Sequence, residues 1–174
     1  VTITDRKTSG KRTILQPMTG SLDPGRVLAI MGPSGCGKTT LLDAIAGRMA
    51  TKKVSGNVFF DGSMATGASR RRVMSYVASD ESLMGVFTTY ETLIHAIRFH
   101  YGCSLSKGQI HDLALKTLAS LGLKNAMHTK VGDIFRKGLS AGQLRRLSLG
   151  VELVKKPAIL VFDKPASGLD SAAA

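Results

Sequence analysis

The sequence predicts an α/β fold built on a mostly parallel sheet, and three features of the chain support this prediction. An apolar run at residues 27–31 leads through a glycine-rich turn into a stretch with helical periodicity. A second apolar run, residues 159–162, follows another stretch with helical periodicity. Strand and helix alternate in this way in folds whose sheet is mostly parallel.

The first half of the chain contains three predicted strands and one helix. Residues 27–31 are expected to form a buried strand, and residues 39–49 a helix whose apolar side chains recur at helical spacing. Further strands are expected at residues 54–60 and 72–78. The first of these ends at Asp61-Gly62, a pair typical of tight turns.

The second half is mainly helical in pattern. Residues 90–100 and 109–121 have helical periodicity and form a predicted helical insertion between about residues 81 and 136. Another helix is predicted to start at Ser140, because Ser140 and Gln143 have the spacing of a capping box, and to stop before Pro157. The strand at residues 159–162 is expected to be buried and to end on Asp163.

Length and composition restrict the class of protein. The chain has 174 residues, enough for one ordinary core, and its longest apolar runs have five residues, so no membrane-spanning segment is expected. Only two cysteines occur, Cys36 and Cys103, which favours a reducing cytosolic setting. The chain begins without a methionine or an apolar signal core and is expected to be a fragment of a larger protein.

The formal net charge of +12 raises the possibility of a polyanionic partner. The basic residues occur in scattered clusters without interleaved aromatic residues, which favours a solvated face or a surface near anionic lipid over specific nucleic-acid binding. These clusters are Lys11-Arg12, Lys52-Lys53, Arg70-Arg71-Arg72, Arg145-Arg146 and Lys155-Lys156.

A phosphate-binding motif follows the first predicted strand. It reads Gly32-Pro33-Ser34-Gly35-Cys36-Gly37-Lys38-Thr39 and matches G-x-x-x-x-G-K-[ST] at every fixed position. Glycines let backbone N–H groups converge on phosphate oxygens, Lys38 supplies positive charge, and the Thr39 hydroxyl can ligate magnesium. The motif, extended to Thr40 and called here the phosphate loop, predicts nucleoside triphosphate binding, which kinases, GTPases, motors and transporters share.

Later motifs resemble those of ATP-binding-cassette proteins. Leu139-Ser140-Ala141-Gly142-Gln143 resembles their Leu-Ser-Gly-Gly-Gln signature, and residues 159–163 with Ser167-Gly168-Leu169-Asp170 resemble their Walker B strand and D-loop. Residues 149–154 and 167–171 look most like the G subfamily of White-type half-transporters and pleiotropic-drug-resistance pumps. The resemblance implies a P-loop NTPase fold with a RecA-like core, about residues 1–80 and 156–174, and a helical subdomain, about residues 81–155.

The resemblance also implies a function. It implies an ATPase that couples ATP binding and hydrolysis to transport, on the cytosolic face of a membrane as part of an integral membrane transporter. In that family two nucleotide-binding domains enclose ATP between the phosphate loop of one and the signature of the other. The partners implied are therefore a second such domain and a transmembrane domain. The ligands implied are ATP and Mg²⁺.

The same resemblance implies roles for individual residues. Gly35, Gly37 and Lys38 would cradle the phosphates, within a loop that also includes Gly32, Pro33, Ser34, Cys36 and Thr40. Thr39 and Asp163 would hold magnesium. Ser140 and Gly142, with Ala141 and Gln143, would contact the nucleotide bound mainly by the partner domain.

Three positions depart from the family's pattern. Lys164 stands where the family has a Glu that activates water, and losing a positioned general base typically costs about 10²- to 10⁴-fold in rate. Ser79 stands where the family's Q-loop has Gln, and Ala141 replaces the first signature glycine. The first 58 residues contain no aromatic residue that could stack on a base, so weak base selectivity is expected.

These departures predict a degenerate site that binds ATP but hydrolyses it slowly, in an asymmetric heterodimer. One alternative is a soluble cassette ATPase that acts on nucleic acid or ribosomes. Another is a pseudoenzyme without a transport role. His95, His100, His111 and His128 all precede the Walker B strand and are expected to be surface histidines, whereas the family's switch histidine would follow the D-loop, beyond Ala174.

Overall fold

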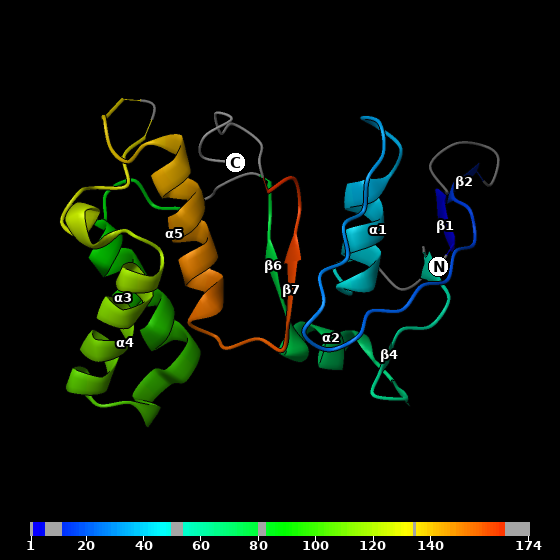
Figure 1. The fold of residues 1–174 in the computed structure, drawn as a ribbon, viewed down its shortest axis with the longest axis horizontal. Coiled ribbons are helices and arrows are strands. Elements are labelled where there is room, and N and C mark those ends of the chain that lie inside the picture. The colour runs from blue at the N-terminus through cyan, green and yellow to red at the C-terminus, as the bar shows by residue number, and fades with distance from the viewer. Residues whose placement is uncertain (1, 6–11, 50–53, 80–82, 134, 166–174) are drawn as a thin grey trace. The chain divides into compact units, whose positions relative to one another are not determined.

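The chain forms two compact units, one up to Met74 and one from Ser75 onward (Figure 1). The computed structural model describes residues 2–5, 12–49, 54–79, 83–133 and 135–165. The D-loop motif, Ser167-Gly168-Leu169-Asp170, and the basic residues Lys11, Lys52 and Lys53 lie outside the described residues.

Where the structure describes it, the first unit consists of short antiparallel strands and two α-helices. Strands β1 (Thr2–Asp5), β2 (Arg12–Leu15) and β3 (Val54–Ser55) form one antiparallel sheet in the order β2-β1-β3. Helices α1 (Lys38–Ile45) and α2 (Gly67–Val73) belong to the same unit. Leu15 and Ala44 form a small core together with Leu41, Met49 and Val54. The prediction of a mostly parallel sheet did not anticipate these antiparallel pairings.

A hairpin confirms the predicted turn at Asp61-Gly62. Strands β4 (Phe59–Phe60) and β5 (Ser63–Met64) pair so that Phe60 is opposite Ser63, which leaves Asp61 and Gly62 as the two turn residues. Their φ angles are 47° and 78°, both positive as a two-residue type I′ turn requires. The predicted strand over residues 54–60 is therefore divided into β3 and β4.

The prediction of a buried strand at residues 27–31 is wrong. These residues have no regular secondary structure, and Val27 and Met31 are 95% and 88% exposed. A strand needs hydrogen bonds to a neighbouring strand, and none of the described strands pairs with this run. Apolar composition alone therefore did not determine its structure.

The described residues of the second unit form three α-helices and a strand pair. Its helices are α3 (Thr89–Tyr101), α4 (Lys107–Ser120) and α5 (Ala141–Leu153), with short 3-10 helices at Gly102–Ser104 and Lys124–Ala126. Strand β6 (Met74–Val77), which begins at the last residue of the first unit, pairs with β7 (Ile159–Phe162). The predicted strand at residues 72–78 is shortened because α2 extends to Val73.

Capping boxes fix where all three helices of the second unit begin. Thr88, Ser106 and Ser140 are the N-cap residues, and each accepts a hydrogen bond from the third residue of its helix, whose side chain accepts one in return. The predicted start at Ser140 is confirmed. Helix termini leave backbone N–H groups without helical partners, and these reciprocal bonds satisfy two of them at each start.

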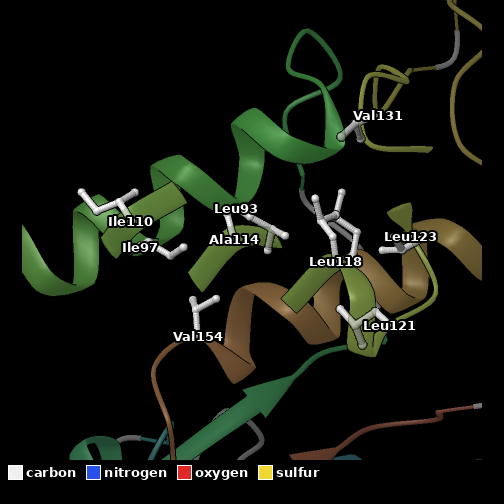
Figure 2. Close-up of a cluster of buried hydrophobic side chains, with 10 residues drawn as sticks. Leu93, Ile97, Ile110, Ala114, Leu118, Leu121, Leu123, Val131 and Val154 are labelled. Carbon is white, nitrogen blue, oxygen red and sulfur yellow. The ribbon is translucent and has the colours of Figure 1, made fainter. Parts of the chain in front are cut away.

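The core of the second unit lies between these helices (Figure 2). On α4, Ile110, Ala114 and Leu118 recur every fourth residue and so share one face, which is buried. Leu93 and Ile97 of α3 and Leu147 of α5 complete it and are fully buried. Burying one such side chain stabilises the fold by about 1.5–3 kcal/mol.

Candidate functional site

The side chain of Lys38 folds back onto the phosphate loop and hydrogen-bonds to its backbone. The Lys38 Nζ donates hydrogen bonds to the backbone carbonyls of Gly32 and Pro33, both at 2.7 Å, and lies 3.6 Å from the Cys36 Sγ. Residues 32–36 are exposed, and Lys38 is half-buried. The Lys38 ammonium group and the exposed backbone of the loop therefore lie together at the start of α1.

Glycine is required at position 37, where the loop becomes helix. Gly37 has a φ of 100°, and a Cβ built there would lie 2.6 Å from the Leu15 Cδ2. Both the backbone conformation and the limited space therefore disfavour any side chain at this position. The first turn of α1 contains no acidic residue, so no carboxylate competes with an anion at this helix N-terminus. These features fit a phosphate ligand.

Two arginines of α2 contact the C-terminal end of α1, a role that the amino-acid pattern around them did not indicate. Arg70 Nη1 donates to the carbonyl of Ala44 at 2.9 Å, and Arg71 Nη1 donates to the carbonyl of Gly47 at 3.3 Å. Cations are favourable near the carbonyl end of a helix. The helix that carries the phosphate loop is thus stabilised at its C-terminus by charge from a neighbouring element.

In the second unit, Asp163 lies directly after β7 and beside the end of β6. It is 3% exposed, and its backbone N–H donates to the carbonyl of Val77 at 3.0 Å. Ser79, half-buried, comes two residues after Val77. Asp163, the predicted magnesium ligand, thus lies beside the end of the strand that precedes the predicted Q-loop position. The phosphate loop belongs to the first unit.

Lys164 follows Asp163 with an unusual backbone conformation. Its φ is 50°, in the left-handed region that non-glycine residues rarely adopt, and its side chain is exposed. Residues held in such conformations cluster at functional sites. Lys156, at the start of the connection from α5 to β7, is also exposed with a φ of 50°.

Arg145 is a site residue that sequence reasoning missed. The expectation of a solvated face is wrong for this member of the Arg145-Arg146 cluster, because Arg145 is only 8% exposed. Its guanidinium donates to the carbonyls of Ala78 and, at 2.8 Å, Asp163. It is buried because the ends of β6 and β7 supply carbonyl oxygens that replace water around the charge. Only the three-dimensional position of those strand ends reveals this.

The signature motif forms the N-terminus of α5. Ser140 Oγ accepts a hydrogen bond from the Gln143 backbone N–H at 3.3 Å, while Gln143 Oε1 accepts one from the Ser140 N–H at 2.9 Å. Ala141 is exposed and Gly142 half-buried. The Gln143 side chain is thus used to cap the helix rather than left free for a ligand.

A hollow of about 560 Å³ lies against this helix start. It is lined by both ends of the preceding loop and by the first turn of α5, and its polar lining includes Asp133, Arg136, Lys137 and Ser140. The lining therefore combines charged groups of both signs with a helix N-terminus.

The four histidines lie outside these groups of residues, and all four are exposed, as expected. The Tyr90 hydroxyl lies 2.7 Å from His111 Nδ1, and the His95 ring packs 4.6 Å, centroid to centroid, from Phe87. Within the part of the chain that the structure describes, no cluster of His, Cys, Asp or Glu residues has the arrangement of a metal site. No helix among the described residues is long and apolar enough to cross a membrane.

The glycine-rich loop before α1 and the capped signature helix α5 define a mixed α/β protein of the P-loop NTPase class. The chain belongs to the ABC transporter family, because the family model described as "ABC transporter" matches residues 15–167. It is 41% identical to the ABC transporter G family member STR of Medicago truncatula, over 92% of this chain and 20% of that protein. It is 38% identical to the G family member 6 of Arabidopsis thaliana, over 95% of this chain and 23% of that protein.

These relatives confirm the resemblance to the G subfamily, and the chain spans about a fifth of the length of the curated relatives it matches. Among solved structures it is similar to the dimeric post-hydrolysis state of the ATP-binding cassette MJ0796 bound to ADP and Pi. The TM-score is 0.79 at 24% identity, covering 99% of this chain and 75% of that one. This likeness confirms the predicted fold class.

Proposed function

We propose that this chain is the ATP-binding domain of a G-type ABC transporter and that it binds ATP with Mg²⁺ through the phosphate loop. The observation that carries the proposal is the geometry at residue 38. The Lys38 ammonium is hydrogen-bonded to two carbonyls of the glycine-rich turn. It lies at the N-terminus of a helix whose first turn has no acidic residue. A fixed cation beside a helix N-terminus provides both charge and N–H donors for a triphosphate.

Within this proposal, individual residues have separate roles. Gly35, Gly37 and Lys38 hold the phosphates. The Thr39 hydroxyl and the Asp163 carboxylate are the oxygen ligands that would hold Mg²⁺, which neutralises charge on the phosphates when it is bound. Burial of Asp163 keeps its carboxylate from moving freely in solvent. In domain terms, a RecA-like core of about residues 1–80 and 156–174 would carry these groups, and residues 81–155 would form the helical subdomain.

We further infer that this chain's own site hydrolyses ATP slowly. The Lys164 side chain is exposed, and an ammonium group cannot accept a proton from an attacking water. Ser79 has a side chain too short to replace the family's glutamine. The signature, Ser140 with Gly142, would serve the nucleotide of a second domain. An asymmetric heterodimer, attached to a transmembrane domain at the cytosolic face of a membrane, follows from this division of roles.

The test measures ATP binding and single-turnover hydrolysis in the full-length protein that contains this chain. Lys38→Ala is expected to abolish ATP binding at this site. Lys164→Glu is expected to raise the hydrolysis rate by about 10²-fold or more, the contribution typical of a positioned general base. Lys156→Glu is the matched control, because it makes the same charge change at an exposed lysine with the same φ of 50°.

Each outcome bears on a different part of the proposal. ATP binding that survives Lys38→Ala would overturn the assignment of the phosphate loop. Equal rates in Lys164→Glu and Lys156→Glu would show that Lys164 is not the defect. Rapid Lys38-dependent hydrolysis by the unaltered protein at this site would mean that another residue supplies the base.

A further inference from the structure

Arg145 connects three parts of the second unit that the proposed function treats separately. It lies in the second turn of the signature helix α5, and its guanidinium reaches the ends of both β6 and β7. Nη1 donates to the carbonyl of Ala78, the residue before Ser79. Nη2 donates to the carbonyls of Asp163 at 2.8 Å and Lys164 at 3.3 Å.

The geometry of these bonds suits arginine only. A guanidinium presents its N–H donors in a rigid planar fork, so two nitrogens can reach two different strands at once. A lysine ammonium in the same place is a single point and cannot span both strand ends. Arg145 is only 8% exposed, and its charge-assisted bond to the Asp163 carbonyl is buried, away from competing water.

The hydrogen bond from Arg145 to the Lys164 carbonyl restrains a residue whose φ of 50° is unusual for a non-glycine residue. A left-handed conformation at a non-glycine residue is unfavourable and persists only where its surroundings hold it. Arg145 holds the carbonyl of Lys164 itself and the carbonyl immediately before it. It therefore fixes the peptide on both sides of the residue whose side chain occupies the position of the family's catalytic base.

We propose that Arg145 is a positioning residue, which sets the Asp163 carboxylate and the side chain of residue 164 relative to the Ser79 position and the signature helix. This inference rests on the proposed function and deepens it. Arg145 would contact neither the nucleotide nor the metal directly. It acts through the main chain, as the outer-shell partners of metal ligands do, whose loss typically costs about 10- to 100-fold in metal affinity or activity.

Arg146 provides a matched control at the neighbouring position. It is exposed, and it donates to the carbonyls of Gly142 within its own helix and of Leu121, both at 3.1 Å. It therefore has the same charge, the same helix and a comparable number of carbonyl contacts, but none to β6 or β7.

The experiment uses the full-length protein and compares Arg145→Met, Arg145→Lys and Arg146→Met. The first measurement is the Mg²⁺ concentration needed for half-maximal Mg²⁺-dependent ATP binding. Arg145→Met and Arg145→Lys are each expected to raise it by about 10-fold or more, in line with the loss of an outer-shell partner. Arg146→Met is expected to leave it unchanged, as is ATP affinity measured in EDTA in all three variants.

The second measurement adds the same changes to the Lys164→Glu variant. In that background Arg145→Met is expected to lower kcat by about 10-fold or more without changing KM for ATP. The reason is that losing Arg145 displaces the carboxylate introduced at position 164 but leaves the phosphate loop unchanged. If Arg145→Met fails to fold, as judged by its thermal melting, Arg145→Lys decides the question, since it keeps the charge and a donor.

The outcomes separate this inference from the proposed function. An unshifted Mg²⁺ requirement in both Arg145 variants, or an equal shift in Arg146→Met, would overturn the role of Arg145 while leaving ATP binding intact. Absence of Lys38-dependent ATP binding in the unaltered protein would instead overturn the proposed function, and the role of Arg145 with it.

Discussion

The contact between Gly37 and Leu15 provides the sharpest test of the phosphate-loop geometry. Replacing Gly37 by alanine places a methyl group 2.6 Å from the Leu15 Cδ2, on a backbone with a φ of 100°. Gly35 is the matched control because its φ of 81° imposes the same kind of backbone strain, while a Cβ there would meet nothing within 4 Å.

The expected losses in the free energy of unfolding follow from backbone strain and from the overlap with Leu15. A left-handed conformation costs an alanine roughly 1–2 kcal/mol, which is the whole expected effect of Gly35→Ala on the free energy of unfolding. Gly37→Ala adds the overpacking of a buried leucine, typically about 1–3 kcal/mol. We therefore expect Gly37→Ala to destabilise the protein by about 2–5 kcal/mol in total.

The assay is urea unfolding of the nucleotide-free chain, followed by far-ultraviolet circular dichroism. A double-mutant cycle with Leu15→Val isolates the collision, because valine lacks the δ-carbon that the new methyl group would strike. We expect a favourable coupling of about 1–3 kcal/mol between Leu15→Val and Gly37→Ala and none between Leu15→Val and Gly35→Ala. Equal losses in the two glycine variants, without coupling to Leu15, would refute the reasoning.

Two further predictions concern the helices of the second unit. Leu118→Ala should lower the free energy of unfolding by about 2–5 kcal/mol because it opens a cavity among fully buried side chains. Met84→Ala, at a residue 66% exposed, should change the same urea midpoint little, and similar losses would contradict this view of the core. The Thr88 backbone N–H and then its hydroxyl lower the pKa of the exposed Glu91 carboxyl. Glu91 in its charged form should therefore stabilise the fold above its pKa in the unfolded chain, and this stabilisation should disappear as pH falls through its lower pKa in the folded state. Glu91→Gln should keep the capping bond but remove this dependence, and a stability difference that stays constant down to acid pH would contradict it.

The helix start at Ser140 was predictable for a local reason. The capping box at Ser140 and Gln143 lies within four residues of sequence, so its hydrogen bonds do not depend on distant segments. The same holds for Asp61-Gly62, whose positive φ angles suit a two-residue turn. The strand at residues 159–162 was also predicted with the bounds that the structure shows.

Features that depend on distant partners were not predictable in this way. The run at residues 27–31 has the composition of a strand, yet a strand is defined by its neighbour, which composition does not specify. Arg145 and Arg146 are identical in type and adjacent in sequence, but only Arg145 is buried, because the ends of two strands lie beside it. The phosphate-loop residues were identifiable by spacing, whereas the support of α1 by Arg70 requires the position of α2.

The two bonds from the Lys38 ammonium to loop carbonyls have a thermodynamic consequence. Ordering a free lysine side chain costs about 2 kcal/mol of rotamer entropy. In this chain the side chain is already ordered against the carbonyls of Gly32 and Pro33 before any ligand arrives. A ligand that engages Lys38 would therefore exchange or share hydrogen bonds rather than immobilise a flexible chain. The heat of binding, more than its entropy, should report on this lysine.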